Sequence, residues 1–435
     1  MSNIINPVEL TSKLIKCESI TPKSAGSIDL IISLLEPLGF SCKKVDFGEG
    51  TEKVENLYAR FGKLEPNICF GGHVDVVPTG DIENWSINPF GGEVKKGKIW
   101  GRGAADMKSG IAAFIAAVSE FLEVNKDFND LGSISLIITS DEEGKAINGT
   151  KKVVDWLISK GESISGCIVG EPTNVNEMGD TIKIGRRGSY TGSLVVKGIQ
   201  GHVGYPHLAE NPINTLLKML EPLSKIYLDD GTKEFQPSSV MITSIDVNND
   251  ASNVIPGEVK AKFNIRFNTL HSINSLTAML KKQFDAITSK YKFEFFCNAE
   301  PFLTSDELLR STLQKAIEKV VKLNPQNSTS GGTSDARFIT KICPVIEFGL
   351  VGKTMHKIDE NVEVNDIIKL NLIYKVKIAD DKFTGYGIKD VNEYFLKDWF
   401  ISVCPIINNK WIKNSNLDLE EISRLPSDYT IKWII

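Results

Sequence analysis

The stretch Gly71-Gly72-His73-Val74-Asp75 indicates the fold of this 435-residue chain. It contains the end of a short apolar run, Asn67–Gly72, and two side chains directly after that run, His73 and Asp75, that suit a metal site. Three more apolar runs have such a side chain within a few residues of their end: Ser133–Thr139, Cys167–Gly170 and Val345–Gly349. Runs of this length predict buried strands. In the first 180 residues, segments with helical periodicity lie between these predicted strands. The chain is therefore predicted to be an α/β protein with a mixed sheet flanked by helices.

Another pattern begins near Ser189. It predicts, in order, a strand, a helix, two strands, a helix and a strand: residues 189–199, 211–226, 238–247, 258–267, 272–289 and 291–297. This order is that of a ferredoxin-like α+β unit. Helical periodicity resumes at 306–323, so we expect the unit to be inserted into the first domain. The predicted domains are a discontinuous catalytic domain at 1–187 and 299–377, an inserted domain at 188–298, and a C-terminal extension of unknown role at 378–435.

Composition narrows the class of protein. The chain is 41% hydrophobic and 24% charged, and its 50 basic and 55 acidic residues leave a formal charge of -5. It is long enough to bury a full core, and it lacks the positive charge that would attract nucleic acid or anionic lipid.

The start of the chain does not resemble a signal peptide, and no segment approaches the roughly 20 apolar residues of a membrane span. Seven dispersed cysteines predict reduced thiols, so a cytoplasmic protein is expected.

His73 and Asp75 are the first candidates for a metal site. In extended backbone, side chains two residues apart point the same way, so Asp75 can accept a hydrogen bond from the distal imidazole nitrogen of His73. Such a carboxylate orients a histidine that binds a metal through its other nitrogen. The alternative is a structural or surface pair.

Four further candidates follow along the chain. Asp106 precedes an apolar helix at 109–124; it could cap that helix, or its two oxygens could bridge two cations. Glu142 and Glu143 belong to Ser140-Asp141-Glu142-Glu143-Gly144, which is either a solvated acidic loop or a set of carboxylates that needs a cation. Glu171 directly follows an apolar run, where burial without a positive partner would be costly. The last candidate is His356, one of five histidines.

The number of candidate ligands matches two zinc ions. Asp106 would bind both ions, His73 and Glu171 would bind one, and Glu143 and His356 would bind the other. Each ion then has three protein ligands, which leaves its fourth position for a shared water, as in catalytic zinc sites. Two such ions, about 3.5–4 Å apart, would acidify that water and polarise a substrate carbonyl. Glu142 is then the candidate general base.

Together these segments resemble the di-zinc aminoacylase/carboxypeptidase family of metallohydrolases. The resemblance rests on five features that span most of residues 1–375: GGHVDVVP at 71–78, GRGAADMKSG at 101–110, SDEEG at 140–144, GEP at 170–172, and the late His356. It implies two Zn²⁺ per subunit, with Co²⁺ as an alternative ion. It also implies that the inserted domain serves as a lid and as the contact of a homodimer.

Within the family, the chain most resembles the enzymes that act on N-succinyl-L,L-2,6-diaminopimelate. The segments in common are GRRGS at 185–189, GIQGHVGYPH at 198–207, NVIPG at 253–257, NIRF at 264–267 and SGGTSD at 330–335. The resemblance implies three groups of substrate-site residues: Arg186 and Arg266, which bind substrate carboxylates; Ser189, Gly332 and Thr333, which line the pocket; and Asn253, Tyr205 and His202, which come from the partner subunit. His202 would also hold the oxyanion. GLVGKTMH at 349–356 differs from the asparagine-bearing version of some relatives at Gly352.

Each of these assignments has an alternative. Arg186 could be a surface charge, Arg266 a structural ion pair, residues 330–335 a flexible turn, and His202 a polar strand end. For the whole chain, the expected reaction is hydrolysis of the small-molecule substrate N-succinyl-L,L-2,6-diaminopimelate to succinate and L,L-diaminopimelate, in lysine and diaminopimelate biosynthesis. The alternatives are an acetylornithine deacetylase, another N-acyl-amino-acid hydrolase of the family, or a non-catalytic binding protein.

Overall fold

The computed structural model describes residues 4–128, 131–380, 406–407 and 410–411. Residues Met1–Asp381 form one compact unit, and Lys382–Ile435 form another. Of the second unit only two short antiparallel strands are described, β20 (Ile406–Ile407) and β21 (Lys410–Trp411). The predicted C-terminal extension therefore lies mostly outside the described residues.

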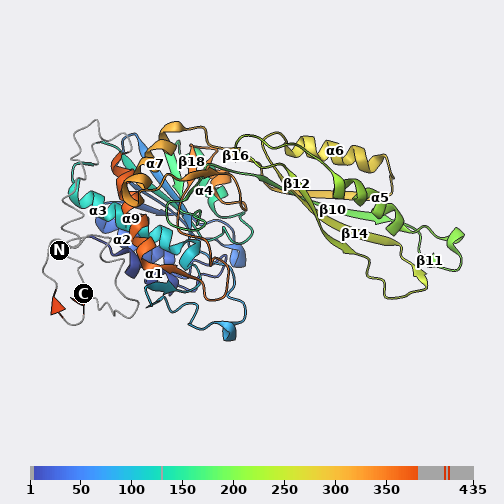
Figure 1. Ribbon diagram of the computed structural model, residues 1–435, viewed down its shortest axis with the longest axis horizontal. Coiled ribbons are helices and arrows are strands. Elements are labelled where there is room, and N and C mark those ends of the chain that lie inside the picture. The colour runs from blue at the N-terminus through green and yellow to red at the C-terminus, as the bar shows by residue number, and fades with distance from the viewer. Residues whose placement is uncertain (1–3, 129–130, 381–405, 408–409, 412–435) are drawn as a thin grey trace. The chain divides into compact units, whose positions relative to one another are not determined.

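An eight-stranded mixed sheet lies at the core of the predicted catalytic domain. In spatial order its strands are β1 (Ser41–Lys44), β2 (Asn56–Phe61), β6 (Ser133–Thr139), β3 (Asn67–His73), β7 (Gly166–Val169), β18 (Val345–Glu347), β8 (Thr181–Lys183) and β17 (Gln326–Ser328). In Figure 1 this domain lies around β18, and the inserted part lies around β10 (Gly188–Lys197) and β14 (Glu258–Phe267). The four apolar runs of the sequence became the neighbours β6, β3, β7 and β18, which are parallel to one another. Their carboxyl ends therefore meet at one edge of the sheet, and the predicted α/β fold class is confirmed.

Helices cover both faces of this sheet. They are α1 (Pro7–Ile15), α2 (Ser27–Leu35), α3 (Ser109–Val124), α4 (Thr150–Ser159), α7 (Glu307–Val321), α8 (Ala336–Ile339) and α9 (Val364–Asp380). Successive side chains of a strand point to opposite faces. Accordingly Cys69 of β3 packs in the cluster with α4 and α8, whereas the ring of Phe70 stacks on Phe114 of α3, at 4.4 Å, and meets Tyr374 of α9. None of the described helices is long and apolar enough to cross a membrane.

The inserted unit has its own sheet and core. Its elements are β10 (Gly188–Lys197), α5 (Pro212–Lys225), β12 (Ser239–Asp246), β14 (Glu258–Phe267), α6 (Ile273–Asp285) and β15 (Tyr291–Ala299), so the predicted ferredoxin-like order is confirmed. The antiparallel sheet runs β12-β14-β10-β15. Alternate residues of β14, such as Phe263 and Ile265, are buried against α5 and α6. This alternation is the pattern of a sheet with one covered face.

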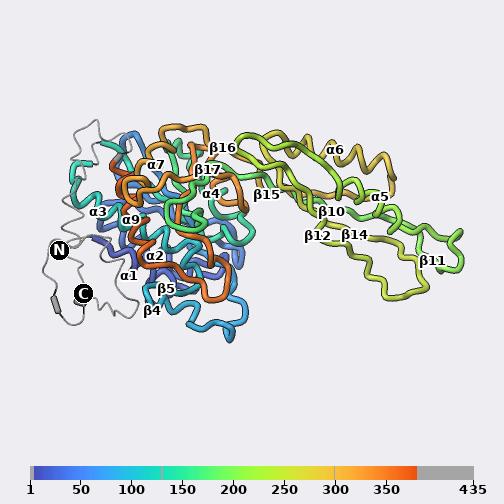
Figure 2. Tube along the Cα trace, in the orientation of Figure 1, coloured from blue at the N-terminus to red at the C-terminus, as the bar shows by residue number. Residues whose placement is uncertain are grey.

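Two connections join the inserted unit to the catalytic sheet. The outgoing connection contains β9 (Gly185–Arg186), and the returning one contains β16 (Phe302–Leu303), which Figure 2 labels. These two strands pair in an antiparallel fashion. We propose 187/188 and 298/299 as the domain boundaries, because β10 begins and β15 ends beside them. The short strands β11 (Gly201–His202) and β13 (Val254–Ile255) also pair within the inserted unit.

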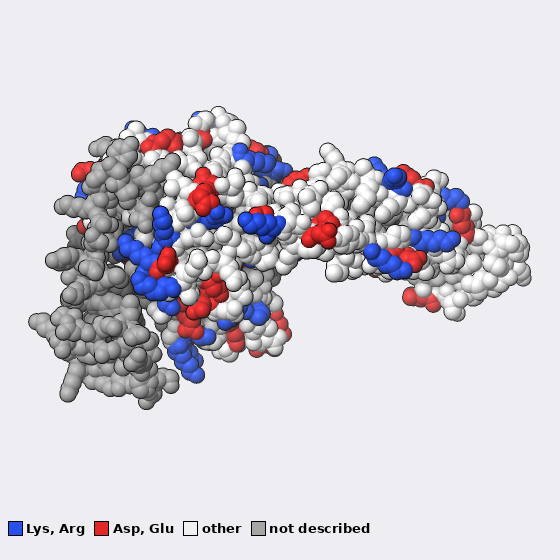
Figure 3. Space-filling model, turned by 45° about the horizontal axis from the view of Figure 1, so that its top comes forward, with Lys and Arg blue, Asp and Glu red and all other residues white. Residues whose placement is uncertain are grey.

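Smaller elements complete the description. A three-stranded sheet contains β4 (Glu93–Lys95), β5 (Lys98–Trp100) and β19 (Asn361–Glu363). On the face shown in Figure 3, basic and acidic side chains are interspersed over the described surface. That distribution agrees with a formal charge of only -5.

Candidate metal centre and active site

Five predicted metal ligands meet at the carboxyl edge of β6, β3, β7 and β18. His73 ends β3, Glu143 follows β6, Glu171 follows β7, and His356 lies in the loop after β18. Asp106 lies in the turn Ala104–Lys108, directly before α3. Because parallel strands end at the same edge, four loops far apart in the sequence bring their side chains to one place.

Ion-pair distances link these five side chains into two groups that share Asp106, and the groups adjoin, because ligand atoms of His73, Asp106 and Glu143 all lie within 4.8 Å of one another. On one side, His73 Nε2 lies 3.2 Å from Asp106 Oδ1 and 3.7 Å from Glu171 Oε1. On the other side, His356 Nε2 lies 3.2 Å from Asp106 Oδ2 and 2.8 Å from Glu143 Oε1. Each oxygen of Asp106 thus faces a different histidine. Imidazole nitrogens and carboxylate oxygens are donors that zinc prefers, so each group of three fits one ion.

Three of the five side chains are buried, and the cluster carries more acid than base. His73 is 2% exposed, and Asp106 and Glu171 are 8% exposed each. Burial, reinforced by the charge of Asp106, raises the pKa of Glu171 well above its ordinary value. Hydrogen bonds to Asp106 and Glu143 raise the pKa of His356 to about 10. Such crowding of carboxylates is the environment that bound cations stabilise.

Asp106 does not cap α3. That helix begins at Ser109 without a side-chain hydrogen bond at its start, and the described partners of the Asp106 carboxylate are His73 and His356. The capping alternative is therefore wrong. Instead, the turn that precedes the helix directs the carboxylate toward the strand ends.

Asp75 occupies a different position from the one we expected. Its backbone carbonyl, not its carboxylate, accepts the hydrogen bond from His73 Nδ1, at 2.9 Å, while Asp75 Oδ1 lies 3.6 Å away. The prediction was wrong because β3 ends at His73, so the rule for extended backbone no longer applies at Asp75. The consequence for His73 is the same as the one predicted: the hydrogen bond from Nδ1 orients the ring, and Nε2, which faces Asp106, is the nitrogen that would bind a metal.

The carboxylate of Asp75 instead fixes the loop that carries the two glutamates. It is fully buried and accepts the backbone N–H groups of Glu142, at 3.2 Å, and Glu143, at 3.1 Å. Burial raises the pKa of Asp75 to about 6. Burial also raises the pKa of Glu142 well above its ordinary value, and the charges of Glu171, Asp335 and Glu143 add to that rise.

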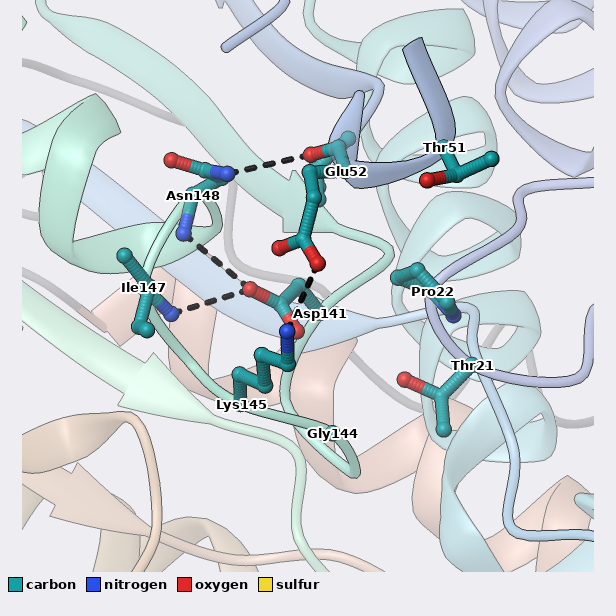
Figure 4. A pocket seen from close by; sticks show the side chains of 10 residues that line it. Thr21, Pro22, Thr51, Glu52, Asp141, Gly144, Lys145, Ile147 and Asn148 are labelled. Carbon is teal, nitrogen blue, oxygen red and sulfur yellow. Dashed lines mark hydrogen bonds and ion pairs between the residues drawn. The ribbon is translucent and has the colours of Figure 1, made fainter. Parts of the chain in front are cut away.

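Asp141 belongs to the same loop and holds its later part, around Ile147 and Asn148. Its carboxylate accepts the backbone N–H groups of Ile147, at 2.9 Å, and Asn148, at 3.1 Å (Figure 4). Asp141 is 3% exposed, so the loop is not the solvated acidic turn of our alternative reading. Asp141, Gly144 and Lys145 of this loop line a cavity of ≈ 290 Å³, where Lys145 pairs with Glu52.

Arg186 is held by an ion pair inside the protein. Its Nε donates to Glu347 Oε2 at 2.8 Å, and its Nη2 donates to the same oxygen. Its Nη1 lies 3.4 Å from the carbonyl oxygen of Ser330 and 3.3 Å from that of Gly332. The surface-charge alternative for Arg186 is therefore wrong, and Thr333 follows in the same turn. In this conformation all three nitrogens of the guanidinium already have acceptors.

Arg266 and Ser189 lie opposite each other across β14 and β10. Burial and the positive charge of Arg187 lower the pKa of Arg266. Within the described part of the chain, neither Arg187 nor Arg266 has an ion pair, and the buried Nε of Arg187 has no hydrogen-bond partner. Our sequence reasoning did not select Arg187. The sequence contained a signal for Arg187: in extended backbone the neighbours Arg186 and Arg187 point to opposite faces, so the two arginines have different surroundings.

His202, Tyr205 and Asn253 lie together on the inserted unit. The rings of His202 and Tyr205 are 5.6 Å apart, and the backbone N–H of Val203 donates to the Asn253 carbonyl. Among the described residues, none of their hydrogen bonds or ion pairs reaches the five-residue metal cluster. The single chain thus keeps these three residues separate from the cluster.

Comparisons with known proteins show the family of the chain. A succinyl-diaminopimelate desuccinylase from Rhodospirillum centenum is 53% identical over 381 residues, covering 87% of this chain and 98% of the relative. One from Pelagibacter ubique is 51% identical over 374 residues, covering 85% and 97%.

Solved structures show the same fold at low sequence identity. An M20 family metallo-carboxypeptidase from Sulfolobus solfataricus matches with a TM-score of 0.68 at 17% identity, covering 86% of this chain and 98% of that one. A dinuclear metal binding peptidase from Bacillus subtilis matches with a TM-score of 0.63 at 14% identity, covering 86% and 98%. The family model described as Peptidase family M20/M25/M40 matches residues 69–376, a span that contains all five residues of the cluster. The chain belongs to this peptidase family, as its motifs indicated.

Proposed function

We propose that this chain hydrolyses the amide bond of N-succinyl-L,L-2,6-diaminopimelate, giving succinate and L,L-diaminopimelate for lysine and diaminopimelate biosynthesis in the cytoplasm. The observation that carries the proposal is the pair of three-donor groups that share Asp106, beside the loop of Glu142. The substrate is supported by relatives of about half-identical sequence over nearly their whole length, which are named succinyl-diaminopimelate desuccinylases.

The proposed cofactors are two Zn²⁺ ions, with Co²⁺ as an alternative. Bound there, the ions would polarise the substrate carbonyl and acidify a water molecule. His73, Asp106 and Glu171 would hold one ion, and Asp106, Glu143 and His356 the other. Glu142 would take a proton from the water and return it to the leaving amine. The carboxylate of Asp75 would keep Glu142 in place through the backbone hydrogen bonds described above.

Arg266 and Arg187 are suited to a substrate that carries carboxylates. The positive charge of Arg187 acts on Arg266, and neither side chain forms an ion pair with an acid of the described residues. Two such positive charges favour the binding of an anion between them. Arg186, Ser189, Gly332 and Thr333 remain proposed pocket residues. Arg186 already forms an ion pair with Glu347. As a pocket residue it would therefore contact Glu347 and the substrate with the same guanidinium.

We expect Arg266→Met to lower kcat/KM for the succinylated substrate about 10–100-fold, since a hydrogen bond to a charged group contributes about 1.5–3 kcal/mol. Steady-state kinetics measures this effect. The matched control is Arg310→Met, because Arg310 pairs with Glu307 on the surface of α7. It should leave kcat/KM unchanged, and an equal loss in both variants would contradict a role of Arg266 in binding.

We also propose a homodimer in which the partner subunit supplies His202, Tyr205 and Asn253. The proposal is supported by the position of these residues, which lie together on the inserted unit without a described contact to the cluster of their own chain. Within a two-fold dimer, each inserted unit could serve the other site. His202 would then donate a hydrogen bond to the oxyanion of the reaction.

The substrate proposal is tested by comparing N-succinyl-L,L-2,6-diaminopimelate with N-acetylornithine on the zinc-loaded protein. We expect a higher kcat/KM for the succinylated compound, because it has carboxylates at both ends. Faster cleavage of N-acetylornithine would instead favour the deacetylase alternative. Absence of turnover with either compound, in protein that contains zinc, would favour a binding protein.

A further inference from the structure

The loop that carries His356 has an unfavourable backbone conformation. His356 has a φ of 61° and Asp359 a φ of 57°, both in the left-handed region, which is uncommon for residues other than glycine even though Asp and His adopt it more often than most. The His356 side chain is also 48% exposed, so close packing does not hold it. Such conformations persist only where the surrounding structure over-determines them. The loop therefore needs an external support.

Arg102 provides one part of that support. Its side chain is 3% exposed. Its Nη1 donates to the carbonyl of Lys357, at 3.0 Å, and its Nη2 lies 3.3 Å from the carbonyl of Pro78. The guanidinium also lies over the ring of Trp85, 5.1 Å from its centroid. Arg102 thus joins the backbone directly after His356 to the segment after β3.

Glu360 provides the other part. It is fully buried, and its Oε2 accepts a hydrogen bond from Arg102 at 2.8 Å. Its Oε1 accepts the backbone N–H groups of Ala105, at 2.8 Å, and Asp106, at 3.2 Å. Its own carbonyl accepts the N–H of Gly101, at 2.9 Å. One buried pair therefore holds both the backbone of Asp106 and the loop of His356.

Both groups share Asp106, whose backbone Glu360 holds, but only one group contains His356, whose loop Arg102 also holds. His73 ends a central strand and Glu171 closely follows another, and neither has a described hydrogen bond to Arg102 or Glu360. His356, in contrast, depends on the loop that the pair supports. Loss of the pair should therefore move His356 Nε2 relative to Asp106 Oδ2 and disturb the other group less.

We propose that Arg102 and Glu360 are positioning residues for the metal ion held by Asp106, Glu143 and His356, and that they determine the affinity of that ion more than the affinity of the other. This inference rests on the proposed metal function. Supporting residues that orient ligands commonly change metal affinity 10–100-fold when they are replaced.

The test is a calorimetric titration of the metal-free, full-length protein with Zn²⁺. For the original chain we expect two ions per subunit. For Arg102→Met we expect one ion to bind with nearly unchanged affinity and the other to bind about 10–100-fold more weakly. Arg102→Lys keeps the charge but loses the planar fork, so it should weaken the same ion by a smaller factor. This milder variant keeps the test valid if the methionine variant does not fold.

The matched control is Glu120→Gln, which replaces a buried charge at a distance from the loop. Glu120 of α3 pairs with Lys375 of α9 at 2.5 Å, and both side chains are less than 10% exposed. We expect this control to lower the melting temperature and to leave both zinc affinities unchanged. Unchanged binding of both ions by the Arg102 variants would overturn the inference, and so would an equal loss for both ions. Fewer than two ions on the original chain would refute the metal proposal itself.

Discussion

Glu142→Gln is expected to reduce turnover about 10²–10⁴-fold while two zinc ions per subunit stay bound. Glutamine has nearly the same shape as glutamate, but it cannot accept a proton from the attacking water. Glu142 is not one of the five donors, so the metal cluster should form without it. The measurement is kcat for the succinylated substrate, with metal content determined on the same sample.

The control for this variant is Glu52→Gln. Glu52 also lies near the acidic loop, where it forms an exposed pair with Lys145, and it has no proposed part in the reaction (Figure 4). It should keep full activity. A Glu142→Gln enzyme within a few-fold of the original kcat would show that another group is the base.

The same variant also tests the proposed dimer. His202→Ala should be nearly inactive as well, because each site would lack its oxyanion donor. When the two inactive variants are mixed and allowed to exchange subunits, one site of each mixed dimer has an intact Glu142 and an intact His202. Partial recovery of activity is therefore expected. No recovery, with mixed dimers present, would refute a contribution from the partner subunit.

Asp106→Ala is expected to remove both zinc ions and all turnover, because each group of donors uses one of its oxygens. Loss of a ligand should weaken binding more than the 10–100-fold that loss of a supporting residue costs. The measurement is zinc stoichiometry by titration of the metal-free protein.

Single-site variants provide the comparison for Asp106. Glu171→Ala and His356→Ala each affect one group of donors, so each should weaken only one of the two ions. Retention of one tightly bound ion in Asp106→Ala would contradict a shared carboxylate. A circular dichroism spectrum should confirm that each variant is folded.

Several features of the fold could be predicted because they depend on local periodicity. The run Ser133–Thr139 became β6 with the same bounds, and the segment Glu258–Phe267 became β14 with the same bounds. Helix α9, in contrast, was not predicted as an element. The burial of its Tyr374 against Phe70 and Phe114 is a tertiary contact between distant segments, which a local pattern does not report.

The site shows the same division. The sequence selected side chains for a metal from their type and from their place after apolar runs, because parallel strands end at one edge. Tertiary structure decided which oxygen of Asp106 faces which histidine, and it placed Arg186 against Glu347, 161 residues away. It also turned the chain after His73, so that the carbonyl of Asp75 replaced the expected carboxylate.

The sequence by itself thus determined the α/β class, the inserted unit, the family and the residue types of the metal cluster, since these follow from periodicity and from motifs within short segments. Only the tertiary structure determined the pairing of Arg102 with Glu360, which are 258 positions apart. Neither residue has a local pattern that predicts its partner, because the partner is selected by the packing of separate loops at the edge of the sheet. The stretch around His73 therefore identifies the site, and the distant loops determine its geometry.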